Sequence, residues 1–134
     1  MMPSWTPTST VMTPVVLCDN IWIDIDSFWQ DSSDPPGIGV YIVNDNPVPV
    51  WIQGVRVHWD FSNGRLLQVK LGDSVLWNGL ANPPDSFWIT VFSENEEIPP
   101  HGTKPLLSYF EILNSFGGYL LEVYINGCYE SGGP

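Results

Sequence analysis

Positive charge is scarce in this sequence. The 134 residues include four Lys and Arg against fifteen Asp and Glu, which gives a formal net charge of −11. A surface of that sign repels phosphate backbones and anionic lipid headgroups. The composition therefore argues against nucleic acid and membrane surfaces as partners.

Long apolar runs and helical periodicity are also missing. No run approaches the ~20 residues of a transmembrane helix, so we expect no membrane insertion. Thirteen Pro and twelve Gly are spread along the chain, which opposes long helices and favours short strands between turns. Apolar residues still make up 43% of the sequence, enough for one domain with a buried core.

Cysteine is limited to two residues, Cys18 and Cys128. Because there is no C-x-x-C pair or Cys/His cluster, no zinc site is expected. We predict a disulfide instead, since the two cysteines lie at the outer ends of the predicted first and last strands; two unpaired buried thiols are the alternative. Such a bond implies an oxidising compartment, hence an extracellular or cell-surface location.

Alternation of apolar and polar residues with a period of two begins after Cys18. It predicts strands over residues 21–25, 38–43, 50–61, 67–71, 75–77, 87–92, 106–112 and 119–125. Gln53-Gly54 interrupts the longest strand and predicts a β-bulge, and Asn63-Gly64 predicts a hairpin turn after it. Seven or eight short strands separated by turns indicate an all-β antiparallel sandwich or barrel over residues 18–134.

The inward positions of the longer strands predict one core between two sheets. Its expected members are Val55, Val57, Trp59, Leu67, Val69, Leu71, Phe110, Leu121, Val123 and Ile125.

Residues 1–17 form an N-terminal extension that differs from the rest. Residues 6–10 are small, hydroxylated and interrupted by Pro, as in a linker or stalk. The candidate O-glycosylation sites are Thr6, Thr8, Ser9, Thr10 and Thr13. Residues 11–17 then become apolar and β-branched, so they either begin the domain's own first strand or pair with a neighbouring copy. The candidate inter-subunit strand consists of Thr10, Val11, Met12, Thr13, Val15, Val16 and Leu17.

Several segments resemble, in the same order, the repeated extracellular Ig-like β-sandwich modules of bacterial surface proteins. They are Val43-Asn44-Asp45-Asn46-Pro47-Val48-Pro49-Val50, Trp59-Asp60, Val69-Lys70-Leu71-Gly72-Asp73, Leu76-Trp77-Asn78-Gly79, Ile98-Pro99-Pro100-His101-Gly102-Thr103 and Asn126-Gly127-Cys128. The resemblance covers roughly residues 18–128 and implies an Ig-like sandwich that serves as a spacer, adhesive piece or assembly subunit. Ser108 departs from the pattern, because a large apolar residue is usual there.

Catalysis, a bound metal and a cofactor are not expected. His58 and His101 have no serine or cysteine nearby in a nucleophile context, and nothing singles out Asp24, Asp26 and Glu122 as paired carboxylates. The acidic residues lack the spacing of a calcium loop.

The sequence contains seven Trp, more than a small core requires. Trp22, Trp29 and Trp51 are candidates for stacking on sugars or anchoring an interface.

The favoured function is a structural subunit that polymerises with copies of itself through its N-terminal strand. The alternatives are a carbohydrate-binding module and a passive spacer.

Overall fold

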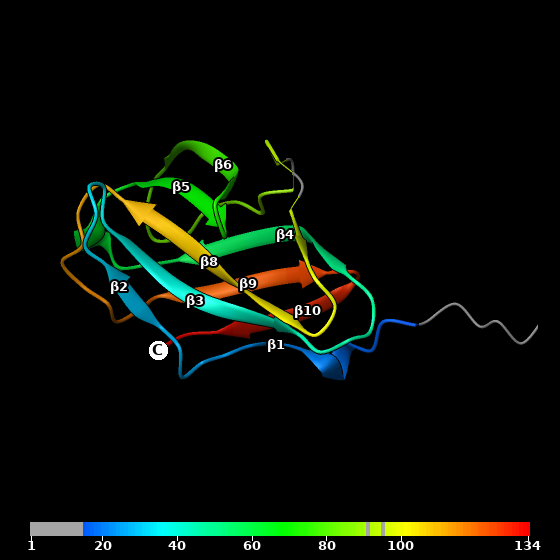
Figure 1. Ribbon diagram of the computed structural model, residues 1–134. Helices are drawn as coiled ribbons and strands as arrows, with labels where there is room; N and C mark the ends of the chain where they lie inside the picture. The colour runs from blue at the N-terminus through cyan, green and yellow to red at the C-terminus, as the bar shows by residue number, and fades with distance from the viewer. Residues whose placement is uncertain (1–14, 91, 95) are drawn as a thin grey trace, which may run out of the picture.

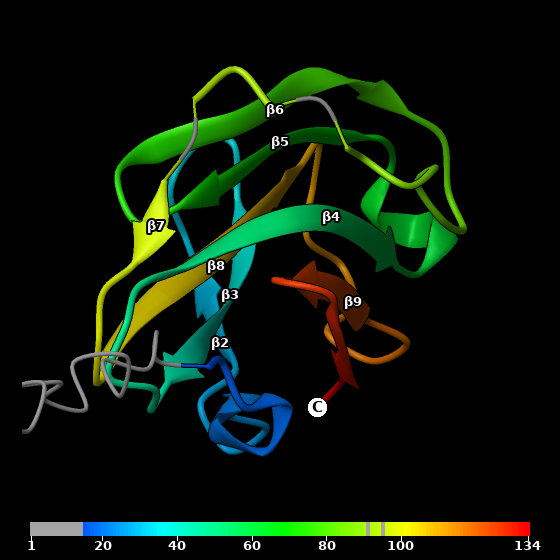
Figure 2. The same cartoon turned by 90° about the vertical axis from the view of Figure 1, so that its right-hand side faces the viewer.

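Two antiparallel β-sheets pack face to face in the computed structural model, which describes residues 15–90, 92–94 and 96–134 (Figures 1 and 2). The strands of the first sheet, in spatial order, are β1 (Ile21–Ile23) with β2 (Trp29–Asp31), then β3 (Gly37–Asn44), β8 (Gly102–Phe110), β5 (Leu66–Leu71) and β6 (Ser74–Ala81). Those of the second sheet are β10 (Cys128–Gly132), β9 (Leu120–Ile125), β4 (Val50–His58) and β7 (Glu97–Ile98). The predicted all-β sandwich is confirmed, with ten strands in the described residues instead of seven or eight.

The inner faces of both sheets form the core, because every second residue of a strand points to the same side. Nine of the ten predicted core residues are buried. Leu67 is the exception: the register against β6 and β8 shifts between Leu66 and Gln68, so Leu66 is fully buried and Leu67 only half-buried. Ser108 is also buried, and its hydroxyl hydrogen bonds to the hydroxyl of Tyr119 at 2.9 Å. That pairing gives the buried hydroxyl of Ser108 a hydrogen-bond partner inside the core.

The predicted bulge and the predicted hairpin turn have different outcomes. The register of β4 against β9 shifts between Ile52 and Gly54, which confirms the predicted bulge. The predicted hairpin at Asn63-Gly64 is wrong, because the 3₁₀ turn η3 (Phe61–Asn63) leads the chain from β4 in one sheet to β5 in the other. The two-residue hairpin lies instead at Asn126-Gly127, between β9 and β10, where both residues have positive φ (48° and 80°).

The strand predicted over residues 87–92 is wrong over its described residues. Residues 85–89 follow β4 through two isolated bridges, His58 with Asp85 and Val55 with Ile89. Between them, the hydroxyl of Ser86 accepts the Val57 N–H at 3.0 Å. A side chain thus takes the place of a backbone ladder bond, which interrupts the strand.

The described chain begins and ends at opposite ends of the sandwich (Figure 1). Residues 15–17 precede the 3₁₀ turn η2 (Cys18–Asn20) at the end where β3 stops and β4 starts. The C-terminus follows β10 to the other end, which carries the connections from β2 to β3 and from β8 to β9.

Candidate functional site

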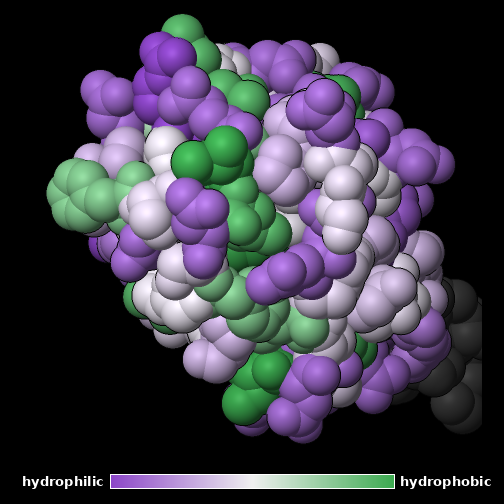
Figure 3. All heavy atoms as spheres, turned by 90° about the vertical axis from the view of Figure 1, so that its left-hand side faces the viewer, coloured by the Kyte–Doolittle hydropathy of each residue, from purple (hydrophilic) through white to green (hydrophobic). Residues whose placement is uncertain are grey.

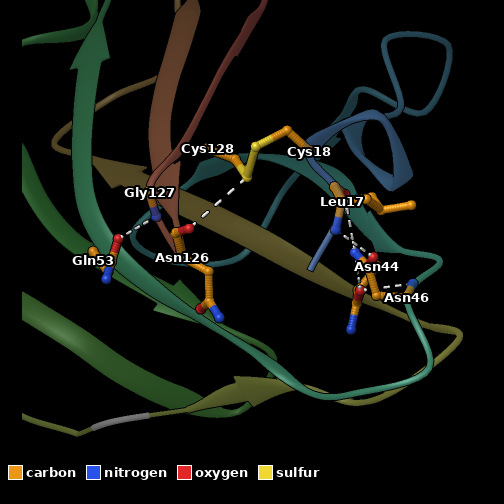
Figure 4. Close-up of a disulfide and its surroundings, with 8 residues drawn as sticks. All are labelled: Leu17, Cys18, Asn44, Asn46, Gln53, Asn126, Gly127 and Cys128. Atoms are coloured by element: carbon orange, nitrogen blue, oxygen red, sulfur yellow. Dashed lines mark hydrogen bonds between the residues drawn. A yellow bond between two sulfur atoms is a disulfide. The ribbon is translucent and has the colours of Figure 1, made fainter. Parts of the chain in front are cut away.

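The N-terminal junction, defined here as residues 15–18 with Asn44, Asn46 and Cys128, is the first candidate site (Figure 4). Asn46 brackets the backbone of Leu17: its Oδ1 accepts the Leu17 N–H at 2.9 Å, and its Nδ2 donates to the Leu17 carbonyl at 3.3 Å. The Asn46 side chain is fully buried. An amide can replace a neighbouring strand in this way because it carries both a donor and an acceptor.

Asn44 holds Asn46 in place through hydrogen bonds. Its Oδ1 accepts both the backbone N–H and the Nδ2 of Asn46, at 3.0 and 3.1 Å. Its own Nδ2 donates to the carbonyls of Val48, Ile98 and Pro99 at 2.9–3.1 Å. The two asparagines of the Val43–Val50 motif therefore join the β3–β4 loop, the β7–β8 loop and the N-terminal segment.

The disulfide lies beside this pair. Cys18 in η2 and Cys128 at the start of β10 are bonded, with their Cα atoms 5.4 Å apart. The predicted bond is confirmed, and the separation lies within the usual window of roughly 4.4–6.8 Å. It ties the first sheet's side of the sandwich to the edge strand of the second.

The N-terminal residues themselves are only partly packed. Val15 and Leu17 are 69% and 56% exposed, whereas Val16 contacts the core. Residues 15–17 belong to no strand of their own domain, and the first strand begins at Ile21. The other candidate residues of this segment lie outside the described part of the chain; they are Thr6, Thr8, Ser9, Thr10, Val11, Met12 and Thr13.

We expect Asn46→Ala to lower the free energy of unfolding by about 2 kcal/mol or more. The substitution leaves the Leu17 N–H without its partner, and an unsatisfied group in a buried region costs roughly 1–3 kcal/mol. It also removes the two hydrogen bonds that Asn46 Nδ2 donates to the Leu17 carbonyl and to Asn44 Oδ1, each worth about 0.5–1.5 kcal/mol. Urea unfolding measures the change. Asp45→Ala is the control, because the exposed Asp45 carboxylate pairs only with His101 among the described residues. It should cost less than about 1 kcal/mol. Equal losses for the two variants would contradict the role of Asn46.

The three candidate tryptophans lie on two different sheets. Trp22 on β1 and Trp29 on β2 belong to the first sheet, where the Trp29 ring contacts Tyr41 with centroids 5.2 Å apart. Trp51 lies on β4 in the second sheet, next to the β9–β10 hairpin, and its N–H donates to Asn126 Oδ1 at 2.9 Å. The structure therefore does not bring the three together in one platform.

A second group of aromatic residues crosses the outer face of the second sheet. This aromatic row consists of Trp88, Tyr124 and Tyr129, with ring centroids 5.1 Å apart between the first two and 5.3 Å between the last two. Tyr124 on β9 lies opposite Tyr129 on β10 and opposite Gly54 on β4. The Trp88 ring passes over Gly54, where an added Cβ would lie 3.4 Å from it. The missing side chain at the bulge lets Trp88 and Tyr124 meet across β4.

A buried carboxylate lies beside the aromatic row. Glu122 is only 7% exposed although it points to the outer face. It accepts hydrogen bonds from Arg56 Nε at 2.6 Å and from the Tyr129 hydroxyl at 2.6 Å, and its Oε2 lies 2.5 Å from His58 Nε2. These four residues are called the Glu122 cluster below. The Arg56 guanidinium, followed by the hydrogen bonds from Tyr129 and His58, holds the pKa of Glu122 at about 2 despite its burial.

The charge of Glu122 should make stability depend on acid pH. A carboxyl whose pKa falls from an unfolded value near 4.5 to about 2 on folding stabilises the fold above pH 4.5, and the contribution is lost as the pH falls towards 2. We expect Glu122→Gln to remove on the order of 2 kcal/mol at pH 6 and far less near pH 2. Urea unfolding at both pH values measures this difference, and an equal loss at each would show that the carboxylate charge is unimportant.

The far end of the sandwich carries a cleft of about 540 Å³. Figure 3 shows this end, where apolar side chains form patches between polar ones. The carboxylates that line the cleft include Asp31, which accepts from the Tyr109 hydroxyl, and Glu111, which pairs with Arg65. In the described part of the chain, no group of three or more His, Cys, Asp or Glu is arranged to hold a metal ion.

Comparison with protein-family models, curated sequences and solved structures gives no match. Within residues 15–90, 92–94 and 96–134, no helix has the length and apolar character needed to cross a membrane.

Proposed function

We propose that this domain is a non-catalytic structural module of a bacterial extracellular or cell-surface assembly, in which copies join head to tail through the N-terminal segment. The main support is that the described chain begins and ends at opposite ends of the sandwich (Figure 1). Modules that are linked head to tail from one end of the sandwich to the other therefore line up in series. The disulfide supports the extracellular part of the proposal, because such bonds persist in oxidising compartments.

The exposed apolar residues of the junction support exchange of the N-terminal segment. Val15 and Leu17 bury little surface in their own domain, and pairing with another copy's sheet edge would bury them and satisfy their backbone groups. A contact between two different surfaces of the same chain does not close on itself, so it propagates into a filament. Copies with a charge of −11 repel one another, so assembly should increase with salt.

Deletion of residues 1–16 tests this proposal. We expect the full chain to form filaments in electron micrographs, and the truncated chain to remain a folded, disulfide-bonded monomer. A matched control replaces residues 10–16 by Gly and Ser at equal length, which keeps the linker but removes the apolar strand; it should also stay monomeric. Assembly unchanged by either variant would contradict strand exchange, and a monomeric full chain would indicate a passive spacer.

A further inference from the structure

The rings of the aromatic row contact one another and are held by the second sheet. Tyr124 and Tyr129 project from the paired strands β9 and β10, and Trp88 lies over the backbone of β4. Tyr124 is 41% exposed, and Tyr129 is also exposed. Rings held by sheet backbone lose little freedom on binding, which favours affinity.

Polar groups lie directly along the row. The Arg56 guanidinium is 5.0 Å from the centre of the Trp88 ring. Of its three nitrogens, only Nε donates a hydrogen bond to a described residue, Glu122. Its two terminal nitrogens therefore have free donors on the described surface. Asp85, which is exposed, lies near His58 Nδ1 at 3.9 Å and offers acceptors. A ligand on the rings meets both donors and acceptors at their rim.

The charges of this face narrow the class of ligand. Glu122 is ionised and already paired, and Asp85 adds a second carboxylate, so an anionic ligand is disfavoured on a protein of charge −11. An apolar partner would bury Arg56 and Asp85 without new hydrogen bonds, which costs free energy. An uncharged ligand with apolar C–H faces and many hydroxyls avoids both costs, because its faces stack on the rings while its hydroxyls bond to the rim.

We propose that the aromatic row and the Glu122 cluster together form a binding site for an uncharged oligosaccharide. This site goes beyond the structural role proposed above and does not depend on it. The first sheet offers an internal comparison, because Trp29 and Tyr41 also stack there, but the strand partner of Tyr41 is Pro105 and no corresponding Arg–Glu pair adjoins it among the described residues.

Titration with a panel of neutral hexasaccharides tests the site: cellohexaose, xylohexaose, mannohexaose and maltohexaose, with oligogalacturonate as the charged comparison. We expect tryptophan fluorescence and calorimetry to show binding of at least one neutral sugar and none of the uronate. Tyr124→Ala should weaken that binding roughly tenfold or more, because it removes one stacking ring. Tyr124→Phe should retain it, since the ring remains.

Tyr41→Ala is the matched control, because Tyr41 is 42% exposed and stacks on a tryptophan as Tyr124 does. It should leave sugar binding unchanged, and thermal unfolding should show both alanine variants folded. Absence of binding across the neutral panel would overturn the proposal, and so would a loss confined to Tyr41→Ala. If Tyr124→Ala abolished self-association in sedimentation while sugars did not bind, the face would be an interface between copies instead.

Discussion

Replacement of both Cys18 and Cys128 by serine should lower the free energy of unfolding by about 4–5 kcal/mol. The bond closes a separation of 110 residues, and a loop of that length greatly restricts the unfolded chain. Since domains of this size are stable by only about 5–15 kcal/mol, the loss is a large fraction of the total. Urea unfolding without reductant, compared between the native and the double-serine chain, measures it.

Reductant provides the control for this experiment. It should bring the native chain down to the stability of the double-serine variant, and it should leave that variant unchanged. A native chain no more stable than the variant in the absence of reductant would contradict the predicted contribution of the bond.

Trp59→Ala should cost about 3–5 kcal/mol, the usual range for removing a buried aromatic side chain. Trp59 is 3% exposed, and its ring packs against Phe110 with centroids 5.5 Å apart. Its Nε1 also donates to the Gly64 carbonyl at 2.8 Å, so the substitution removes a hydrogen bond together with the packing. Chemical denaturation followed by tyrosine fluorescence and circular dichroism gives the change.

Phe61→Ala is the matched control for Trp59, because Phe61 follows it by two residues and is 71% exposed. It should change stability by less than about 1 kcal/mol. Similar losses at the two positions would mean that Trp59 does not anchor the core.

The longer strands could be predicted from the sequence because each provides enough residues for alternation to be recognised. The strand β4, with Val55 and Val57 inward and Arg56 outward, is an example. The strands β2, β7 and β10 have two to five residues, and Cys-Tyr-Glu-Ser-Gly in β10 carries no apolar alternation. Their place is set by neighbours distant in the sequence, as is the one-residue shift that buries Leu66 in place of Leu67.

The disulfide was predictable from its two cysteines, whereas the aromatic row was not. Trp88, Tyr124 and Tyr129 come from separate segments, and only the bridges along β4 and the β9–β10 hairpin bring them together. Glu122 occupies an outward position in the alternation, which normally indicates a solvated side chain. It is buried because Arg56, His58 and Tyr129 surround it from neighbouring strands.

The position of the disulfide also determines how the module would respond to stretching. Tension applied at the two ends of the chain reaches Cys18 on one side and Cys128 on the other, and then passes through the sulfur atoms. The polypeptide between them would bear no load. Peeling β10 from β9 could release only residues 129–134, roughly 20 Å of extended chain, while roughly 350–400 Å inside the covalent loop stays folded. In an array of such modules, the covalent loop would make each one nearly inextensible.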